Sequence, residues 1–547
     1  MSEQGDFELY DTTLRDGTQQ EGLVLSVEDK LAVARLLDGL GVGYIEGGWP
    51  GAVPKDTEFF RRAQSELVLQ HAELAAFGAT RRAGVPVSVD PQVRALLAAE
   101  TPVVTLVAKS HPAHVDRALR TTLAENLAMI GSTVRHLVRA GRTVFLDAEH
   151  YFDGHHANRE YALAVVRTAA EAGASTVVLC DTNGGMLPDE IGTVVADTLA
   201  LTGVPLGIHC HNDSGCAVAN TMAAVDAGAV HAQGTAHGYG ERCGNANLFT
   251  VIANLVLKRG REVIPLERLK HLTDTGRTLS EITGVPGVPA DPYTGASAFT
   301  HKAGLHASAL RVDPGLYQHT NPALFGNVMR TLVSDMGGRS SVELKARELG
   351  YDVAAGDETV ARAAARVKEL ESRGYSFETA DASFELLLRD EIAGGRERRP
   401  FEVEEWSVGV GRRRNGDSGT EAHVRLRVDG VPLSATGTGN GPLNALDNAL
   451  HAALDPFFPA LARLVLTDYQ VRLLSGQTGT DAAARVLISY RDGRERPSGK
   501  TAWSTVGVDT NTVTAGWRAL LDAVHYVLLD QVREQPASAA PLAAPTP

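Results

Sequence analysis

The sequence contains few cysteines and no long run of apolar residues. Its 547 residues include only Cys180, Cys210, Cys216 and Cys243, and none of these forms the CxxC pair typical of zinc or redox sites. We interpret each as a small buried packing residue in a reducing compartment. No apolar stretch is long enough to span a bilayer, and the first residues contain no basic and apolar signal segment. These absences predict a cytoplasmic protein that does not bind a membrane.

The sequence also lacks an excess of basic residues. Lysine and arginine number 52 against 66 aspartates and glutamates, which gives a formal net charge of -14. Binding nucleic acid by neutralising phosphates needs the opposite balance, so we expect no nucleic-acid partner. A GxGxxG fingerprint is missing as well after the first apolar strand, where DTTLRDGTQQEG follows. Its absence argues against an open, doubly wound dinucleotide-binding sheet.

One pattern repeats from residue 7 to about residue 250. A short apolar run is followed by a polar turn and then by an amphipathic helical stretch. Eight such runs are present: FELYD at Phe7, YIEGG at Tyr44, LAAFG at Leu74, VVTLVAK at Val103, TVFLDAE at Thr143, TVVLCDT at Thr176, PLGIHCH at Pro205 and VHAQGTA at Val230. Eight βα units predict an α/β protein with a closed (β/α)8 TIM barrel, which we place at residues 1–270. The active site of such a barrel lies at the carboxyl ends of its strands.

After residue 270 the repeat stops. A segment rich in glycine and proline, TGVPGVPADPYTGASAF, leads into helical stretches, and we expect a helical connecting subdomain at residues 271–395. Residues 396–533 contain one unit twice, in which alternating strands, a glycine- and threonine-rich turn and a long amphipathic helix follow one another. This repeat predicts a pseudo-symmetric α+β regulatory domain. Residues 534–547 have little to bury and should form a disordered tail.

The motif HCHND at the end of the seventh predicted strand is typical of a metal site. Alternation along a strand places the imidazoles of His209 and His211 on one face, toward the barrel mouth. Asp16 after the first strand and Asn245 after the eighth can add oxygen ligands, because a closed barrel brings these strands together. Such a site with open positions would chelate a 2-keto acid. Taken singly, Asp16 also fits a turn or cap residue, and Asn245 an N-cap.

Four motifs occur in order along the chain: DTTLRDGTQ at residues 11–19, HCHND at 209–213, GERCGN at 240–245 and HKAGLH at 301–306. On these motifs the chain resembles the 2-isopropylmalate, homocitrate and citramalate synthase family over nearly its whole length. The resemblance implies the metal ligands Asp16, His209, His211 and Asn245, an active-site arginine at Arg15, a barrel glutamate at Glu149 and a catalytic histidine at His306. It also implies that Thr182 contacts the keto-acid carboxylate, although Thr182 fits a helix cap nearly as well.

The resemblance further implies a condensation of acetyl-CoA with a 2-keto acid, assisted by a divalent metal ion. Mixed nitrogen and oxygen ligation accepts zinc, manganese, cobalt or magnesium. The methyl group of a thioester is a poor acid, so a base is needed, and we expect His306 with Glu149 to supply it, without assigning which of them takes the proton. In the family the segment with His306 comes from the partner subunit. This implies a homodimer in which the connecting subdomain acts in trans; a monomer folded back on itself is the alternative.

Three further segments favour one branch of the family. EGGWPGAVPKD at residues 46–56, DAEHYFDG at 147–154 and GNVMRTLVSDMGGRSS at 326–341 look most like the citramalate synthase branch. That branch implies pyruvate as the acceptor, (R)-citramalate as the product and a place in isoleucine biosynthesis. An isopropylmalate synthase acting on 2-ketoisovalerate in the leucine pathway is the alternative, because one or two pocket residues shift such a choice by only about 1–3 kcal/mol.

Two glycine-rich turns in the last domain, ATGTGNGP at residues 435–442 and STVGVDTN at 504–511, precede helices whose amino ends can hold a carboxylate. By resemblance this is an amino-acid feedback site, and isoleucine is the effector that the branch implies. A module that only dimerises is the alternative.

Two other function classes compete with this interpretation. An acyl-CoA lyase shares a related barrel, and it would place a catalytic cysteine in a glycine-rich loop at the end of the barrel. Cys243 in GERCGN has such a position, but HKAGLH and the last domain argue against a lyase. A non-catalytic amino-acid sensor would have lost some metal or acid-base residues, and all of them are present.

Overall fold

The computed structural model describes residues 7–354, 356–397, 399–412, 418–474, 482–491 and 502–534. The chain forms two compact units, Met1–Phe299 with Asn321–Val328 and Thr300–Thr320 with Met329–Pro547. Residues 271–395, expected as one connecting subdomain, are therefore divided between the two units, and the limits of the functional domains stay a prediction. The tail expected at residues 534–547 lies, from residue 535 onward, outside the described residues.

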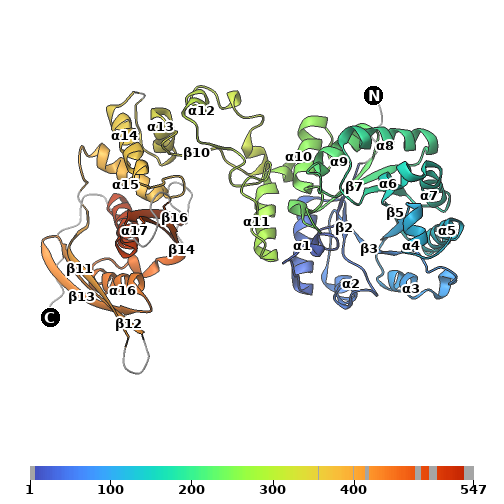
Figure 1. Ribbon diagram of the computed structural model, residues 1–547, viewed down its shortest axis with the longest axis horizontal. Helices are drawn as coiled ribbons and strands as arrows, with labels where there is room; N and C mark the ends of the chain where they lie inside the picture. The colour runs from blue at the N-terminus through green and yellow to red at the C-terminus, as the bar shows by residue number, and fades with distance from the viewer. Residues whose placement is uncertain are drawn as a thin grey trace. The chain divides into compact units, whose positions relative to one another are not determined.

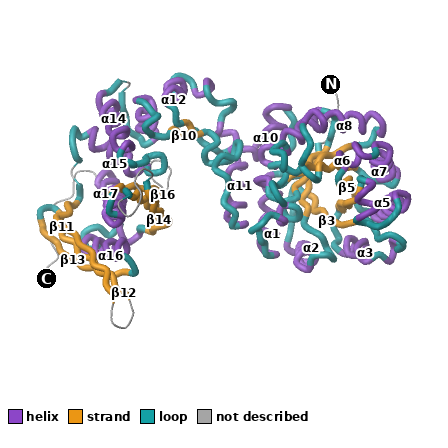
Figure 2. The backbone as a smooth tube through the Cα atoms, viewed as in Figure 1, coloured by secondary structure: helices purple, strands orange, loops and turns teal. Residues whose placement is uncertain are grey.

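The first unit is a closed barrel of eight parallel strands, as the repeat predicts. Each strand pairs with the next along the chain, and the eighth pairs with the first. The strands are β1 (Glu8–Asp11), β2 (Tyr44–Glu46), β3 (Glu73–Ala79), β4 (Val103–Lys109), β5 (Thr143–Glu149), β6 (Thr176–Asp181), β7 (Leu206–Cys210) and β8 (His231–Gly234). Figure 1 shows them inside a layer of helices, and Figure 2 separates the orange strands from the purple helices around them.

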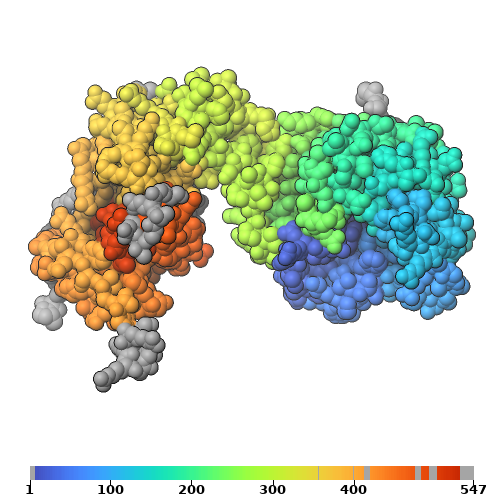
Figure 3. All heavy atoms as spheres, in the orientation of Figure 1, coloured from blue at the N-terminus to red at the C-terminus, as the bar shows by residue number. Residues whose placement is uncertain are grey.

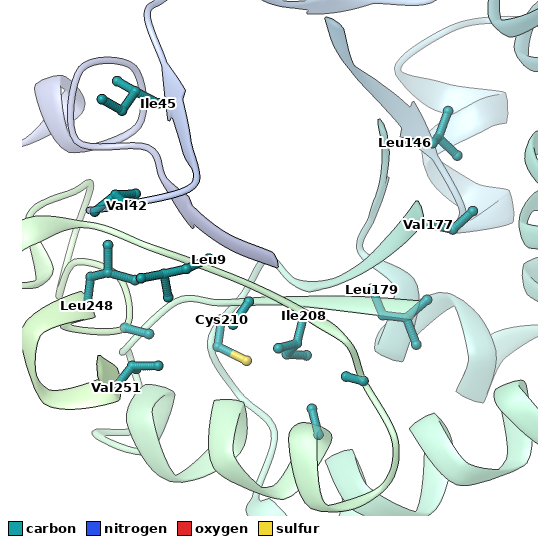
Figure 4. Close-up of a cluster of buried hydrophobic side chains, with 14 of the residues drawn as sticks. Leu9, Val42, Ile45, Leu146, Val177, Leu179, Ile208, Cys210, Leu248 and Val251 are labelled. Carbon is teal, nitrogen blue, oxygen red and sulfur yellow. The ribbon is translucent and has the colours of Figure 1, made fainter. Parts of the chain in front are cut away.

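The helices of this unit cover the outside of the barrel. They are α1 (Val27–Leu40), α2 (Pro54–Glu66), α3 (Pro91–Ala98), α4 (Pro112–Arg117), α5 (Leu123–Arg139), α6 (Tyr151–Ala157), α7 (Arg159–Glu171), α8 (Pro188–Thr202), α9 (Ala217–Asp226), α10 (Leu248–Arg259) and α11 (Leu272–Thr283). One large apolar cluster fills the space between strands and helices, and Figure 4 shows part of it, including Leu9 of β1, Leu179 of β6 and Ile208 of β7. In the space-filling view this unit, coloured from blue to green, is closely packed (Figure 3).

Local sequence signals set the ends of these helices. The hydroxyl of Ser26 accepts a hydrogen bond from the backbone N–H of Asp29, whose carboxylate accepts one from the backbone N–H of Ser26, so α1 begins with a complete capping box. The same helix ends at Gly41, which has a φ of 96°, a left-handed conformation that favours glycine. Among the described residues no helix is both long and apolar enough to cross a membrane.

Side-chain alternation along the strands builds the inside of the barrel in layers. Tyr10, Ala75, Val103 and Phe145 form a separate buried cluster, which fills the interior near the amino ends of the strands. Positions two and four residues further along each strand point the same way, because side chains alternate between the two faces. The barrel therefore has an apolar floor and a mouth whose chemistry is set by the last residues of each strand.

The second unit begins with a small sheet and four helices. Its elements are β9 (Thr300–His301), α12 (Gly304–Leu310), β10 (Arg330–Thr331), α13 (Arg339–Glu348), α14 (Glu358–Ser372) and α15 (Asp381–Ile392). The strands β9 and β10 pair in parallel, and α13, α14 and α15 pack through a common apolar cluster.

The rest of the second unit is the predicted repeat, with three antiparallel strands and a helix in each half. The first half is β11 (Phe401–Arg412), β12 (Ser418–Val428), β13 (Val431–Gly439) and α16 (Pro442–Leu454). The second half is β14 (Val465–Leu473), β15 (Ala484–Arg491), β16 (Ala502–Asp509) and α17 (Thr512–Glu534). The α+β prediction is thereby confirmed.

Glycines at matching positions let each helix of the repeat approach its sheet closely. A Cβ added at Gly437 would meet the backbone of Ala445 and Ala449 on α16, and one added at Gly507 would meet the backbone of Ala515 and Ala519 on α17. Each glycine stands five residues before its helix begins, and the four alanines are buried. The repeat seen in the sequence therefore preserves one mode of helix-to-sheet packing.

Candidate active site

The carboxyl ends of the barrel strands surround a cavity of about 660 Å³. Interior positions of neighbouring strands line it: Phe77 and Ala79 of β3, Val107 and Lys109 of β4, Asp147 and Glu149 of β5, Cys180 and Thr182 at the end of β6, and His209 and His211 at the end of β7. Arg15 and Asp16, from the loop after β1, complete one side. The carboxyl ends of these six βα units thus meet in one space, because alternation turns the interior side chains of their strands toward it.

Three of the predicted metal ligands converge in this cavity. The Nε2 atoms of His209 and His211 lie 3.3 Å apart. The Oδ2 atom of Asp16 lies 3.2 Å from the first and 3.6 Å from the second. Asp16 precedes the short 3-10 helix Gly17–Gln19, but its carboxylate makes no cap hydrogen bond there. All three side chains are buried, and three ligand atoms this close, from one carboxylate and two imidazoles, suit a divalent cation.

Asn245 lies beside this group. It forms an isolated β-bridge with His211, and its Nδ2 donates a hydrogen bond to the carbonyl of Tyr239 at 2.9 Å. Its Oδ1 is buried and has no hydrogen-bond partner among the described residues. Asn245 does not cap α10, because that role belongs to Asn247, whose side chain accepts from the N–H of Phe249. A buried amide oxygen without a partner is costly, and a metal ion would satisfy it.

The charges of these groups depend on one another. Burial alone would raise the pKa of Asp16, but the charge of Arg15 and the hydrogen bond with His209 hold it well below its ordinary value. Burial, followed by the charge of His209, lowers the pKa of His211 to about 4. Burial would also lower the pKa of His209, yet Asp16 raises it through a hydrogen bond and its charge. An ionised carboxylate and a neutral imidazole are ligand forms, and the proton that Asp16 favours on His209 is the one that metal binding would displace.

Arg15 is fixed on three sides. Its Nε donates to Oε2 of Glu46 at 2.6 Å, its Cζ lies 3.9 Å from the ring centroid of Phe77, and its Nη1 lies 3.5 Å from Oδ1 of Asp16. Glu46 is fully buried and accepts from two further hydroxyl groups. Although burial opposes it, the charge of Glu46 followed by that of Asp16 raises the pKa of Arg15 above its usual value. The guanidinium is therefore a permanent, oriented positive charge at the cavity wall.

The other predicted barrel residues also line the cavity. Glu149 forms an ion pair with Lys109, which ends the neighbouring strand. The hydroxyl oxygen of Thr182 accepts a hydrogen bond from the backbone N–H of His150 at 2.8 Å. Thr182 does not cap α8, whose N-cap is Leu187.

His306 lies on α12, in the second unit, and not on the barrel. Its ring centroid lies 4.1 Å from that of Tyr317 and 6.0 Å from that of His301. Its approach to the barrel mouth, in cis or in trans, stays a prediction.

Sequence reasoning overlooked three residues of the site: Phe77, Asp147 and Gln233. Phe77 stacks on Arg15, and Gln233 contacts both His209 and Asp147. A signal for two of them was present. Asp147 stands two residues before Glu149 on β5, and Gln233 stands two residues after His231 on β8. Residues two apart on a strand point to the same face, so both side chains point into the barrel.

The cysteines take no part in the ligand cluster. All four are free thiols; Cys180 and Cys210 are buried, Cys216 is half-buried and Cys243 is exposed. Interpreting each as a buried packing residue was therefore wrong for Cys243, which is exposed in the loop after β8, between Gly240 and Gly244 with their positive φ angles.

Comparison with known proteins identifies the family. Residues 6–280 match the HMGL-like family, residues 293–375 the homocitrate synthase post-HMGL domain-like family and residues 378–528 the LeuA allosteric (dimerisation) domain. An (R)-citramalate synthase of Streptomyces coelicolor is 58% identical over 523 residues, which cover 96% of this chain and 97% of that protein. An (R)-citramalate synthase of Aquifex aeolicus is 47% identical and covers 96% and 98%. One of Sulfolobus acidocaldarius is 42% identical and covers 95% and 96%. The chain therefore belongs to the HMGL-like family and, within it, to the citramalate synthases.

Proposed function

We propose that this protein condenses acetyl-CoA with pyruvate to give (R)-citramalate and CoA. The observation that carries the proposal is the meeting of Asp16, His209 and His211 beside Arg15 in one cavity. The chain that holds this site is 58% identical, over 96% of its length, to an (R)-citramalate synthase.

The keto acid is held by charge and by hydrogen bonds. Asp16, His209, His211 and Asn245 would hold the divalent cation, with zinc, manganese, cobalt and magnesium as candidates, and when bound it polarises the keto carbonyl. Arg15 stabilises negative charge on the same oxygen or on the enolate of the thioester, since Glu46 and Phe77 keep its orientation.

Thr182 is suited to the carboxylate of the keto acid. Its oxygen already accepts from the N–H of His150, so its own hydrogen is free to be donated to the substrate. A threonine hydroxyl oriented in this way discriminates in favour of a ligand with an oxygen acceptor at that point.

Proton removal from the acetyl group is assigned to Glu149 together with His306. Glu149 lines the cavity and forms an ion pair with Lys109. The acetyl methyl carbon, once deprotonated, attacks the keto carbon of pyruvate, the π bond of the carbonyl opens, and its oxygen takes up a proton to become a hydroxyl group. Water then cleaves the thioester to a carboxylate and releases CoA. The LeuA dimerisation domain supports a homodimer, in which His306 would reach the cavity of the partner.

A thiol-release assay tests this function. Purified protein receives acetyl-CoA with pyruvate, 2-ketoisovalerate or 2-ketoglutarate, and free CoA thiol is followed with a chromogenic disulfide. We expect the fastest release with pyruvate, abolition by a chelator and restoration by a divalent cation. Faster release with 2-ketoisovalerate would instead assign the isopropylmalate reaction.

The repeat in the second unit holds a second cavity, of about 570 Å³, which we call the module cavity. The amino end of α16 contributes Asn440, Gly441, Pro442, Leu443, Asn444 and Asp447, the strands β14 and β15 contribute Leu466, Tyr469 and Tyr490, and the amino end of α17 contributes Thr512, Val513, Gly516 and Leu520. Two helix amino ends thus line one cavity, and each follows one of the two glycine-rich turns.

The module cavity fits isoleucine as a feedback effector. The helix amino ends suit its carboxylate, Leu443 and Val513 suit its side chain, and Asp447 suits its ammonium group. Oδ1 of Asp447, which lies 3.7 Å from Nε2 of His451, and the hydroxyl of Tyr490 are buried and make no hydrogen bond among the described residues. Two unsatisfied polar atoms on one apolar cavity support a ligand more than a purely structural role.

A further inference from the structure

We propose that Gln233 and Asp147 are positioning residues for the metal site, which fix the tautomer of His209 so that its Nε2 can bind the cation. This inference rests on the metal site of the proposed function, but it concerns two residues outside the predicted ligand set. It also makes a prediction about metal affinity that does not depend on which keto acid is the substrate.

The three residues form one chain of hydrogen bonds across the barrel interior. Nδ1 of His209 lies 2.9 Å from Oε1 of Gln233, and Nε2 of Gln233 donates to Oδ1 of Asp147 at 3.0 Å. The residues come from β7, β8 and β5. Their exposed fractions are 5%, 1% and 4%, so water does not compete freely for these bonds.

This series of hydrogen bonds has a direction when Asp147, its last member, is ionised, because a carboxylate can only accept. An ionised Asp147 offers no hydrogen, so the amide of Gln233 must turn its NH2 group toward Asp147 and its oxygen toward His209. An oxygen facing Nδ1 requires the hydrogen of the neutral imidazole to be on Nδ1. The lone pair is then on Nε2, the atom that lies 3.3 Å from Nε2 of His211 and 3.2 Å from Asp16.

Packing alone does not account for a polar pair at this depth. The floor of the same barrel is filled by Tyr10, Ala75, Val103 and Phe145, so the fold accepts large apolar side chains in its interior. Burying an amide and a carboxylate costs free energy unless both are well bonded. An amide at residue 233 can accept from His209 and donate to Asp147 at the same time. A carboxylate there would place a second negative charge beside Asp147.

The test compares metal affinity among variants at about pH 8, where Asp147, whose pKa burial raises to about 7, is ionised. Manganese is titrated into metal-free protein and binding is read by calorimetry, with the melting temperature of the metal-free protein as a folding check. Gln233→Leu should weaken binding by about 10- to 100-fold with little change in the metal-free melting temperature.

Gln92→Leu is the matched control. Gln92 is half-buried. It accepts from Nε1 of Trp49, which lines the cavity, and donates to the carbonyl of Pro50, and none of the hydrogen bonds among the described residues joins it to a proposed ligand. It should leave manganese affinity within about 2-fold of the parent protein. Equal losses in Gln92→Leu and Gln233→Leu would overturn the proposal, because they would reflect general loosening of the wall.

A second pair of variants keeps the proposal testable if Gln233→Leu does not fold. Asp147→Asn lets the amide of Gln233 turn over, which places its NH2 group on His209 and favours the wrong tautomer, so affinity should fall several-fold. Combining Asp147→Asn with Gln233→Glu restores an acceptor at His209 and a donor behind it, and affinity should recover to within about 3-fold of the parent. A double variant as weak as Asp147→Asn alone, or an Asp147→Asn variant with parental affinity, would overturn the proposal. If the variants show the expected manganese affinities but the parent protein does not condense acetyl-CoA with pyruvate, the result would count against the proposed function and not against this inference.

Discussion

The barrel mouth and the module cavity are of similar size, but charged side chains line the first and mostly apolar side chains line the second. The mouth is crowded with buried ionisable groups that hold one another in place, as Asp16, Arg15 and Glu46 do. The module cavity has aliphatic and aromatic walls, two helix amino ends and one carboxylate, Asp447. A site with oriented charges can stabilise charge that develops during a reaction. A mostly apolar site with few polar groups binds and releases a small amphipathic molecule.

The two sites also differ in how the chain assembles them. The mouth draws residues from strands far apart in sequence, and closure of the barrel brings β1 beside β8. The module cavity is built by duplication, because the same kind of helix end occurs twice and both copies line it. Removing a residue from the mouth should therefore stop chemistry, whereas changing the module cavity should alter control.

The largest effect is expected for His209→Ala. It removes one of three converging ligand atoms, so manganese affinity should fall by more than about 100-fold and CoA release with it. Isoleucine binding, measured by calorimetry on the full chain, should stay as in the parent if the two sites have separate roles.

The control for this variant is His423→Ala, which removes a histidine on β12 that contacts only the hydroxyl of Ser434 among the hydrogen bonds described. Full turnover in His209→Ala would refute the metal site. Loss of both manganese and isoleucine binding in this variant would show that the two cavities do not have separate roles.

A smaller effect, confined to the module cavity, is expected for Asp447→Asn. The change removes the charge that would pair with the ammonium group of isoleucine, so the half-inhibitory concentration should rise by about 10-fold or more. The measurement is CoA release against isoleucine concentration, with activity in its absence as the reference.

Asp468→Asn provides the comparison, because Asp468 is exposed on β14, which carries Leu466 and Tyr469, and it accepts from the amide of Gln470 without lining the cavity. Equal shifts of the half-inhibitory concentration in both variants would mean that the charge acts at long range. No shift in Asp447→Asn would show that Asp447 does not bind the ammonium group.

The sequence predicts much of this arrangement, and its limits have physical causes. Strand alternation and the HCHND motif suffice to place His209 and His211 at the barrel mouth. They do not predict that Gln233 spans from His209 to Asp147, since that contact depends on the stagger and tilt with which the strands close. The glycine-rich turns predict helix amino ends that can hold a carboxylate. They do not predict that both ends line one cavity beside the unpartnered hydroxyl of Tyr490, because that depends on how the two halves pack. Distances between elements are the information that single-sequence patterns lack.

The smallest effect on function is expected for a variant that tests the duplication itself. Gly507→Ala adds a methyl group that must displace the backbone of α17 at Ala515, so the module should lose about 1–3 kcal/mol of stability. Gly409→Ala on β11 is the control, because nothing lies within 4 Å of the added carbon. Urea unfolding followed by tryptophan fluorescence suits the measurement, since Trp406, Trp503 and Trp517 belong to this module and only Trp49 to the barrel. The transition of the module should shift while metal binding by the barrel does not. Equal stability of the two glycine variants would show that α17 can move away from its sheet, and the close approach would then have no energetic role.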